Sequence, residues 1–379
     1  MRPITVSRAS DGQGGGLRGS VLVIGAGVSG LTSALCLRRR GFEVTVIADQ
    51  FAPRVTSVVA GALWEWPPAV CGHHQDQVSL DRSKIWCHQS YEIFADLALD
   101  PMTGVFLKPV TFYVQHPISA DERLQMKVDE LRGKVREFKH DSSLIRDNGV
   151  NPRLGFQDAY SYLAPMIDTD AYMYWLLGEA QKAGCQIIES QVTGNLRQQE
   201  SSLASRYGVD AIVNCTGLGA TELTGDLVSP LRGALIRLRN DGKTMPRITQ
   251  AHCVSHDGSG EGRGFIFIVP RGEDILLLGG LAEPDERDLE IGLHNYEPIR
   301  EMYQRCLEFL PVLRGATIDA AEPVRVGLRP VRLQNVRLER EAGTRIVHNY
   351  GHGGSGVTFS WGCSFEVAER VADLLAEGN

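Results

Sequence analysis

A glycine-rich turn near the N-terminus has the spacing of a phosphate-binding site. Residues 21–24 read Val-Leu-Val-Ile, and the next six residues match G-x-G-x-x-G. The apolar run predicts a buried strand, and the glycines permit a tight turn, close approach to a pyrophosphate and close packing of the next helix. That helix's free N–H groups and dipole favour an anion at its N-terminus. Dinucleotide binding is therefore predicted for Gly25, Ala26, Gly27, Val28, Ser29 and Gly30.

The elements after this turn support the same interpretation. Residues 31–40 predict a helix that ends at Gly41, and residues 44–47 predict a second short strand. Asp49 follows Gly30 by 19 residues, where a carboxylate can accept hydrogen bonds from ribose hydroxyls and would repel a 2′-phosphate. The pattern favours a βαβ dinucleotide unit over a glycine-rich turn without a ligand, and it leaves FAD and NAD undistinguished.

Length and composition exclude several classes of protein. A chain of 379 residues predicts about two domains, and 43% hydrophobic with 22% charged residues is typical of a globular protein. The net charge of −7 provides no basic surface for nucleic acid or an anionic membrane, and no apolar run is long enough to span a bilayer. The eight cysteines form no C-x-x-C pair, as expected for reduced thiols of a cytoplasmic protein.

One cluster of side chains has the residue types of a metal site. Cys71, His73, His74, Cys87 and His88 lie close together in the sequence, but their spacing matches no standard zinc pattern. We therefore expect no metal.

Later segments predict a second domain inserted into the first. Residues 209–214 form an apolar strand that ends in small polar residues, and from residue 231 the periodicity indicates an antiparallel sheet. We expect an α/β fold: a discontinuous Rossmann-like domain with an inserted α+β substrate domain. The expected ranges are 20–66, 156–230 and 320–379 for the nucleotide domain, 67–155 and 231–319 for the substrate domain, and 1–19 for a flexible leader.

Six blocks of sequence, in the right order, resemble the D-amino-acid oxidase and glycine oxidase family of FAD-dependent oxidoreductases. They are residues 21–31, 47–53, 60–64, 213–217, 327–332 and 348–356. The resemblance implies non-covalent FAD, whose ring accepts hydride at N5, so that the protein supplies binding, orientation and electrostatics. It also assigns cofactor contacts to Gly61, Ala62, Leu63 and Trp64 in a loop over the flavin, to Thr216 and Gly217 after the second nucleotide strand, and to Gly353, Ser355, Gly356, Val357 and Thr358.

Two features correspond to the catalytic residues of the family. They are the run from Gly353 to Thr358 and one arginine. Backbone N–H groups around Gly354 would face the pyrimidine end of the ring, which becomes negative on reduction. Arg329, in a G-x-R-P context, would bind a substrate carboxylate bidentately. The alternative for Arg329 is a buried ion pair, for example with Glu322.

Two positions depart from the family pattern. Phe267 stands where D-amino-acid oxidases carry a tyrosine that donates to the carboxylate, and the preceding loop offers Arg263 instead. Loss of that hydrogen bond would cost about 1.5–3 kcal/mol if nothing compensates. Glu65 follows Trp64 where a neutral residue is common, and it would either bind a substrate ammonium or face a salt partner.

The predicted activity is oxidation of the C–N bond of a D-amino acid or an N-substituted glycine. The imine would hydrolyse to a 2-oxo acid and an amine or ammonia, and O2 would reoxidise the flavin with release of H2O2. The alternative is a flavin-dependent dehydrogenase with another electron acceptor. The expected partners are a small amino-acid substrate and O2, and the sequence leaves the oligomeric state open, with a homodimer as one option.

Overall fold

The first sheet of the computed structural model, which describes residues 19–67, 74–254 and 265–377, contains the glycine-rich turn. Its order is β14-β15-β7-β1-β2-β6, parallel except for the β14–β15 pair. The bounds are β1 (Ser20–Ile24), β2 (Glu43–Ala48), β6 (Gln186–Glu189), β7 (Ala211–Asn214), β14 (Arg337–Arg340) and β15 (Ile346–Tyr350).

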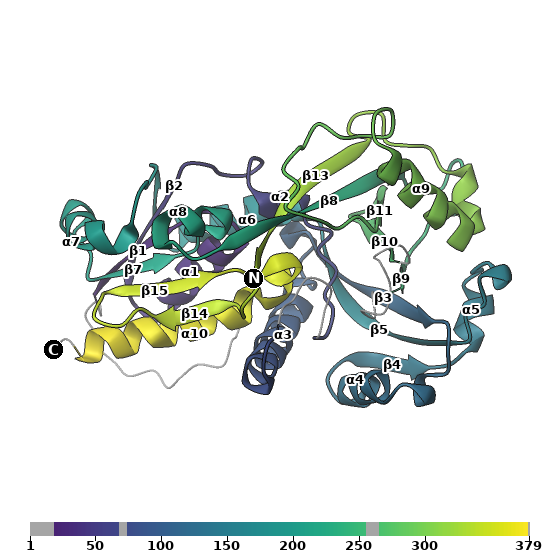
Figure 1. Cartoon of the computed structure of the whole chain (residues 1–379), viewed down its shortest axis with the longest axis horizontal. Coiled ribbons are helices and arrows are strands. Elements are labelled where there is room, and N and C mark those ends of the chain that lie inside the picture. Colours follow the sequence, from purple (N-terminus) through teal and green to yellow (C-terminus); the bar gives the residue numbers. More distant parts are fainter. Residues whose placement is uncertain (1–18, 68–73, 255–264, 378–379) are drawn as a thin grey trace.

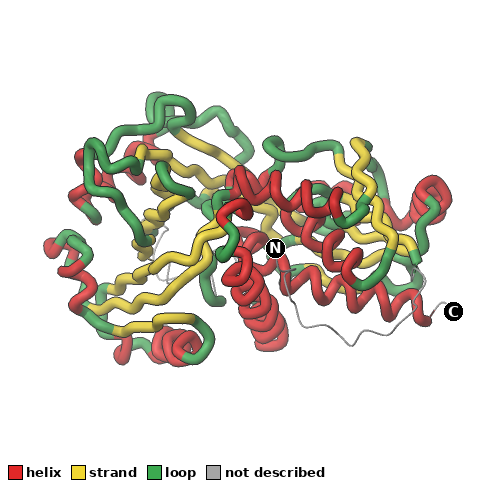
Figure 2. The backbone as a smooth tube through the Cα atoms, turned by 180° about the vertical axis from the view of Figure 1, so that it is seen from behind, coloured by secondary structure: helices red, strands yellow, loops and turns green. Residues whose placement is uncertain are grey.

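Both faces of this sheet are covered, which explains the unbroken apolar run of β1. Val21 and Val23 pack into the core beneath α1 and α10, whereas Leu22 and Ile24 pack into a second cluster beneath α7. Figure 2 shows helices gathered over this half of the molecule. The helices of this half are α1 (Val28–Arg39), α3 (Gln77–Leu97), α6 (Thr169–Lys182), α7 (Leu196–Tyr207), α8 (Ala220–Thr224) and α10 (Gly356–Glu377).

The second sheet has the order β12-β8-β11-β10-β9-β3-β5-β4, with β13 paired to β8. It is antiparallel except for the β3–β9 pair. Its strands are β3 (Val105–Val114), β4 (Arg136–His140), β5 (Asp158–Ile167), β8 (Val228–Arg239), β9 (Ala251–Val254), β10 (Ile266–Arg271), β11 (Ile275–Gly279), β12 (Glu283–Pro284) and β13 (Val324–Arg332). In Figure 1, β8 and β13 run from the middle of the molecule into this half.

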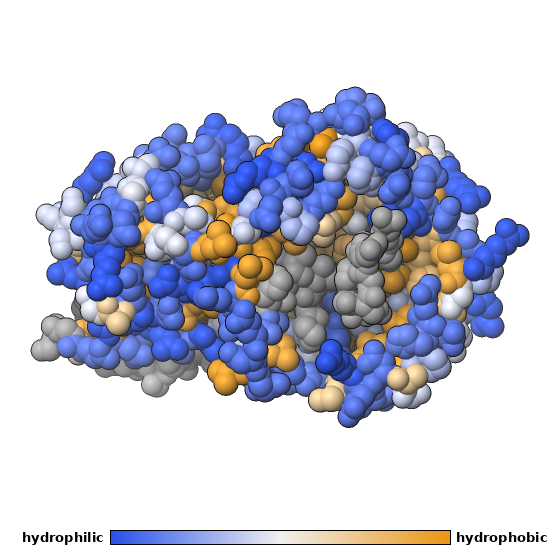
Figure 3. All heavy atoms as spheres, viewed as in Figure 1, coloured by the Kyte–Doolittle hydropathy of each residue, from blue (hydrophilic) through white to orange (hydrophobic). Residues whose placement is uncertain are grey.

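Short helices complete the second half. α9 packs on β8, β10 and β11 and closes a separate apolar core. The remaining elements are α2 (Thr56–Val59), α4 (Glu122–Arg132), α5 (Ser143–Asp147) and α9 (Glu297–Phe309), with 3₁₀ turns at Pro101–Thr103, Ile118–Ala120, Pro152–Leu154, Gly217–Gly219, Pro311–Gly315 and Gly353–Ser355. The view in Figure 3 shows a mostly hydrophilic face with apolar residues in small groups. No helix within the described ranges is both long and apolar enough to cross a membrane.

Strands of the two sheets alternate along the chain more often than the expected domain ranges imply. β5 and β13 fall within the ranges 156–230 and 320–379 expected for the nucleotide domain, yet they pair with β3 and β8 of the second sheet. The domain boundaries therefore stay a prediction. Pro109 lies in β3, which is not an edge strand, because β3 lies between β5 and β9. β9 pairs only with Val110–Phe112, so the missing N–H of Pro109 is tolerated.

Candidate active site

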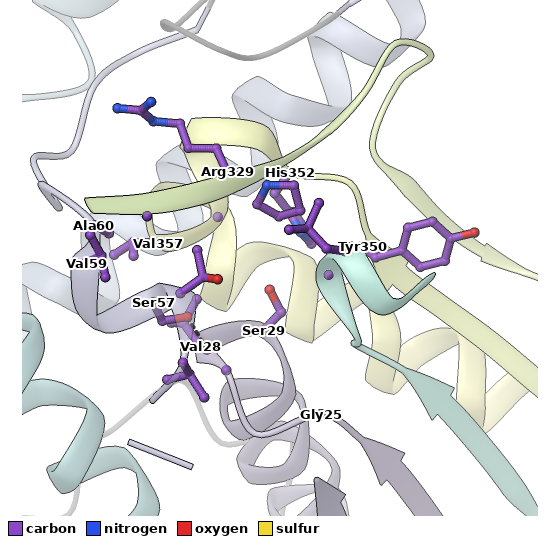
Figure 4. A pocket seen from close by; sticks show the side chains of 18 of the residues that line it. Gly25, Val28, Ser29, Ser57, Val59, Ala60, Arg329, Tyr350, His352 and Val357 are labelled. Atoms are coloured by element: carbon purple, nitrogen blue, oxygen red, sulfur yellow. Dashed lines mark hydrogen bonds between the residues drawn. The ribbon is translucent and has the colours of Figure 1, made fainter. Parts of the chain in front are cut away.

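A cavity of about 480 Å³ is lined by residues from both sheets. One end holds the turn after β1, and the other holds residues of β8, β10, β11 and β13. In Figure 4, Gly25, Val28 and Ser29 lie at one end and Arg329 at the other, with Ser57, Val59 and Ala60 between them. Of the residues predicted for the site, the cavity brings together Gly25, Ala26, Gly27, Val28, Ser29, Asp49, Gly61, Ala62, Leu63, Glu65, Thr216, Gly217, Phe267, Arg329, Gly353, Gly354, Ser355, Gly356, Val357 and Thr358.

The turn after β1 can be built only with glycine. Gly25 has φ +110°, and a Cβ there would lie 2.5 Å from the carbonyl oxygen of Cys215. A Cβ on Gly30 would lie 1.9 Å from the carbonyl oxygen of Gly25. Gly30 does not line the cavity; instead it lets α1 pack against the turn. Gly25 and Gly27 therefore present backbone, and no side chain, to the cavity.

The start of α1 leaves donors for an anion. Its N-cap, Gly27, has no side chain to cap the helix. The N–H of Val28 donates to Oγ of Ser57 at 3.0 Å. This contact was missed from the sequence, because Ser57 lies in a segment of small residues without a motif. Asp49 follows β2, is exposed and lines the same end of the cavity.

The loop at residues 60–63 is held in an unusual backbone conformation. Ala62 has φ +50°, which is costly for a residue with a side chain. Its carbonyl oxygen accepts from the N–H of Ile167 at 3.0 Å, and the guanidinium of Arg271 donates to the carbonyl of Ala60. These contacts from β5 and β10 fix the loop against the cavity.

Trp64 has a different position from the one predicted. It does not line the cavity. Its side chain is 1% exposed, its Nε1 donates to the carbonyl of Cys87 at 2.9 Å, and its ring packs on Tyr91 with centroids 4.8 Å apart. Trp64 thus anchors the end of the loop in the core.

Residues 352–358 form the wall between the two ends. The 3₁₀ turn Gly353–Ser355 leads into α10 at Gly356. His352 lines the cavity beside it, and its Nε2 lies 3.0 Å from Oδ1 of Asn349. Burial lowers the pKa of His352 to about 4, so the ring is neutral at pH 7. Among the described residues, the buried Oγ of Ser355 has no hydrogen-bond partner, which fits a polar ligand at this wall.

Arg329 reaches the cavity from β13. Its Nη1 donates to the carbonyl oxygens of Arg232 at 3.4 Å and Leu281 at 3.3 Å. A Cβ on Gly233 would lie 2.2 Å from this Nη1, so the glycine makes room for the guanidinium. The alternative pairing with Glu322 is wrong, because that carboxylate binds Arg325 at 2.6 and 2.7 Å. Within the described ranges no carboxylate pairs with Arg329.

Phe267 closes the substrate end of the cavity. Two carbons of its ring lie 2.7 Å from the position that a Cβ on Gly61 would take. The ring therefore packs directly on the loop at residues 60–63. Phe265 and Leu235 line the cavity beside it and make this wall apolar. Arg263, the other residue predicted here, lies outside the described residues.

Glu65 both lines the cavity and has a salt partner. Its Oε1 lies 3.0 Å from Nζ of Lys127, with side chains 16% and 11% exposed. Burial alone would lower the pKa of Lys127, but Tyr160 and Glu65 more than offset it and raise the pKa. The structure thus supplies the ion pair that was one of the two alternatives for Glu65. Of the cysteines and histidines weighed as metal ligands and not expected to bind one, Cys71 and His73 lie outside the described residues.

The family model described as FAD dependent oxidoreductase matches residues 20–370. The chain belongs to this family. It is 35% identical over 375 residues to the D-amino-acid oxidase of Rubrobacter xylanophilus, covering 95% of this chain and 99% of that one. It is 34% identical over 359 residues to the D-amino-acid oxidase of Streptomyces coelicolor, covering 93% and 97%. The fold is similar to that of glycine oxidase from Bacillus cereus, with TM-score 0.70, 18% identity and coverage of 95% and 96%.

These findings confirm the resemblance, the FAD cofactor, the class of enzyme and the expected α/β fold with a parallel sheet and a second sheet. The residues of the cavity fit FAD on structural grounds. The start of α1 has no side-chain cap, so backbone N–H groups of the turn are available to a pyrophosphate. The buried hydroxyl of Ser355 provides a polar group that a bound ring could satisfy.

Proposed function

We propose that this protein oxidises the C–N bond of a D-amino acid or an N-substituted glycine, with Arg329 binding the substrate carboxylate. The observation that carries the proposal is the position of Arg329. Its guanidinium lies in the cavity, backed by two carbonyl oxygens and without a carboxylate partner among the described residues. A planar guanidinium whose other N–H groups donate to no carboxylate in the described residues is suited to bind a substrate carboxylate bidentately.

The residues around Arg329 would orient the rest of the substrate. The apolar wall of Leu235, Phe265 and Phe267 would receive a side chain and keep water from the reacting carbon. Such a wall favours apolar side chains over charged ones. We propose Arg263 and Glu65 as further residues that contact the substrate, and Gly354 as a residue whose backbone N–H faces the pyrimidine end of the flavin ring.

The cofactor contacts are proposed for the residues that line the other end. The turn Gly25–Ser29 would bind the pyrophosphate through N–H groups, and Asp49 the ribose. The two loops at Gly61–Leu63 and Thr216–Gly217 and the run from Gly353 to Thr358 would enclose the ring. Gly30 and Trp64 would act indirectly, by packing the turn and anchoring the loop.

The reaction balances without a nucleophile from the protein. FAD, when bound, supplies a ring that accepts an electron pair. The Cα–H bond of the substrate breaks with loss of hydride, and one N–H proton is released, which leaves an imine. Water hydrolyses the imine to a 2-oxo acid and ammonia or an amine. O2 takes up the electron pair with two protons as H2O2.

The test begins with the purified protein and its visible spectrum. We expect a yellow protein that releases FAD on acid precipitation, which would show that the cofactor is not covalent. Under anaerobic conditions, D-amino acids with apolar side chains or N-alkylglycines should bleach it, L-enantiomers should not, and air should restore the colour with one H2O2 per substrate. Bleaching that only a dye reverses would indicate a dehydrogenase. Failure of every carboxylate substrate to bleach the flavin would overturn the proposal.

A further inference from the structure

A partly buried cluster of Arg232, Glu283 and Tyr296 lies behind Arg329. Arg232 is 2% exposed, and its Nε donates to Oε2 of Glu283 at 2.9 Å. Its Nη2 donates to the hydroxyl of Tyr296 at 2.8 Å, and that hydroxyl donates to Oε1 of Glu283 at 2.6 Å. Each member therefore contacts the other two.

The cluster joins β8 to the segment that follows β11. Glu283 lies in β12, where it pairs in register with Arg232. Nη1 of Arg232 also donates to the carbonyl of Asp288 at 2.8 Å. One side chain thus fixes both ends of residues 283–288 to β8.

The same two backbone segments provide the carbonyl oxygens that contact Arg329. Nη1 of Arg329 lies 3.4 Å from the carbonyl of Arg232 and 3.3 Å from the carbonyl of Leu281, two residues before Glu283. Gly233, the next residue of β8, leaves room for the guanidinium. Side chains alternate along a strand, so Arg232 points away from the face on which Gly233 receives Arg329. The cluster acts on Arg329 through these backbone positions, not by direct contact.

The cost of burying these charges suggests a role beyond stability. A buried ion pair contributes little net stability, and its best-supported use is to fix one arrangement among several. The segment that this cluster holds is short and leads into exposed residues 285–288. Apart from the cluster, this segment is held to β8 by the two-residue pairing of β12 and by the N–H of Asp285, which donates to the carbonyl of Pro230 at 2.9 Å, while the Leu281 side chain packs in the apolar core.

We propose that Arg232, Glu283 and Tyr296 are positioning residues that set the orientation of the Arg329 guanidinium toward the substrate carboxylate. The inference rests on the proposed function of Arg329. It predicts that affinity for carboxylates depends on side chains that do not reach the cavity.

The test measures binding of benzoate, an aromatic carboxylate, to the FAD-loaded protein through the change in its visible spectrum. Tyr296→Phe removes one hydroxyl and leaves Arg232 paired with Glu283. We expect the affinity for benzoate to fall and the KM for a D-amino acid to rise, each on the order of tenfold, which is equivalent to about 1.4 kcal/mol. FAD content and kcat should stay within about twofold, the scale of measurement error in such comparisons. Arg232→Met should have a larger effect in the same direction. Arg82→Met is the matched control. It removes a half-buried arginine of α3 whose Nη2 lies 2.6 Å from Oε1 of Glu366 in α10.

A double-mutant cycle separates positioning from general loss of structure. In an Arg329→Lys background, Tyr296→Phe should weaken benzoate binding no further, because the group that it orients is gone. An equal penalty in both backgrounds, or unchanged benzoate binding in Tyr296→Phe, would overturn the inference. If Arg232→Met does not fold, Tyr296→Phe and Glu283→Gln decide the question. If Arg329→Lys itself leaves benzoate binding unchanged, the proposed function fails instead.

Discussion

The two ends of the cavity are built in opposite ways. The end proposed for the phosphates contains the consecutive residues Gly25–Ser29, and a Cβ on Gly25 or Gly30 would clash with the backbone there. The carboxylate end consists of side chains from β8, β10 and β13, which are far apart in the sequence. The first end therefore depends on backbone conformation and the second on contacts between distant segments. Substitutions should have different consequences at the two ends.

The largest effect is expected at the phosphate end. Gly30→Ala would place a methyl group 1.9 Å from the carbonyl oxygen of Gly25, so the turn must open. We expect a colourless protein or one that does not fold, measured by the ratio of flavin to protein absorbance and by circular dichroism. Gly178→Ala is the control, because no atom lies within 4 Å of its Cβ position in α6. A Gly30→Ala protein with full flavin content would contradict the role given to this turn.

At the carboxylate end, Arg329→Ala should affect turnover and leave the cofactor in place. Loss of a hydrogen-bonded charge partner costs about 2–5 kcal/mol, so kcat/KM for carboxylate substrates should fall about 100-fold or more. Steady-state peroxide production and flavin content measure the two effects separately. Loss of FAD together with activity would show that the two ends are not independent.

One contact joins the two ends, and it should give an intermediate effect. Gly61→Ala would bring a Cβ to 2.7 Å from two ring carbons of Phe267. We expect the free energy of unfolding to fall by about 1–3 kcal/mol, as for other overpacked sites. Phe267→Leu in the same chain should recover most of that loss. Urea denaturation of the single and double variants tests this, and strictly additive losses would argue against the contact.

A further effect concerns pH and develops gradually as pH falls. Burial lowers the pKa of His252 and of His352 from 6.5 to about 4. The unfolded chain therefore takes up protons that the folded chain does not as pH falls from about 6.5 to 4, and stability falls over that window by up to about 1.4 kcal/mol per pH unit for each histidine.

His252 lies in β9 of the second sheet, and His352 lies in the wall formed by residues 352–358. Comparing the two histidines therefore tests whether the second sheet and this wall unfold together. His252→Phe and His352→Gln should each reduce the slope of unfolding free energy against pH by about one proton. A reduced slope for His252→Phe alone would mean that the second sheet unfolds separately. The measurement is urea denaturation from pH 7 to pH 4.5.

The strand, turn and helix around the glycine-rich motif were predicted correctly because the information for them is local. G-x-G-x-x-G and the flanking strand and helix lie within twenty residues, and each step follows from backbone geometry. Arg329 was identified only through its sequence context in the family. Its surroundings were not predicted: Glu283 and Tyr296 lie 51 and 64 residues from Arg232. The anchoring of Trp64, and the pairing of β5 and β13 with the second sheet, also depend on contacts that no local pattern encodes.

The register of β13 limits how the surroundings of Arg329 can change in this chain. Two residues after Arg329, Val331 forms an antiparallel bridge with His352, next to the glycine run at Gly353. Two residues of a strand span about 6.6 Å and return to the same face. An insertion or deletion between them would turn Arg329 to the opposite face or break the bridge. If Arg329 binds the substrate carboxylate as proposed, we expect substrate range to change through the side chains around it and not through the length of β13 between Arg329 and Val331.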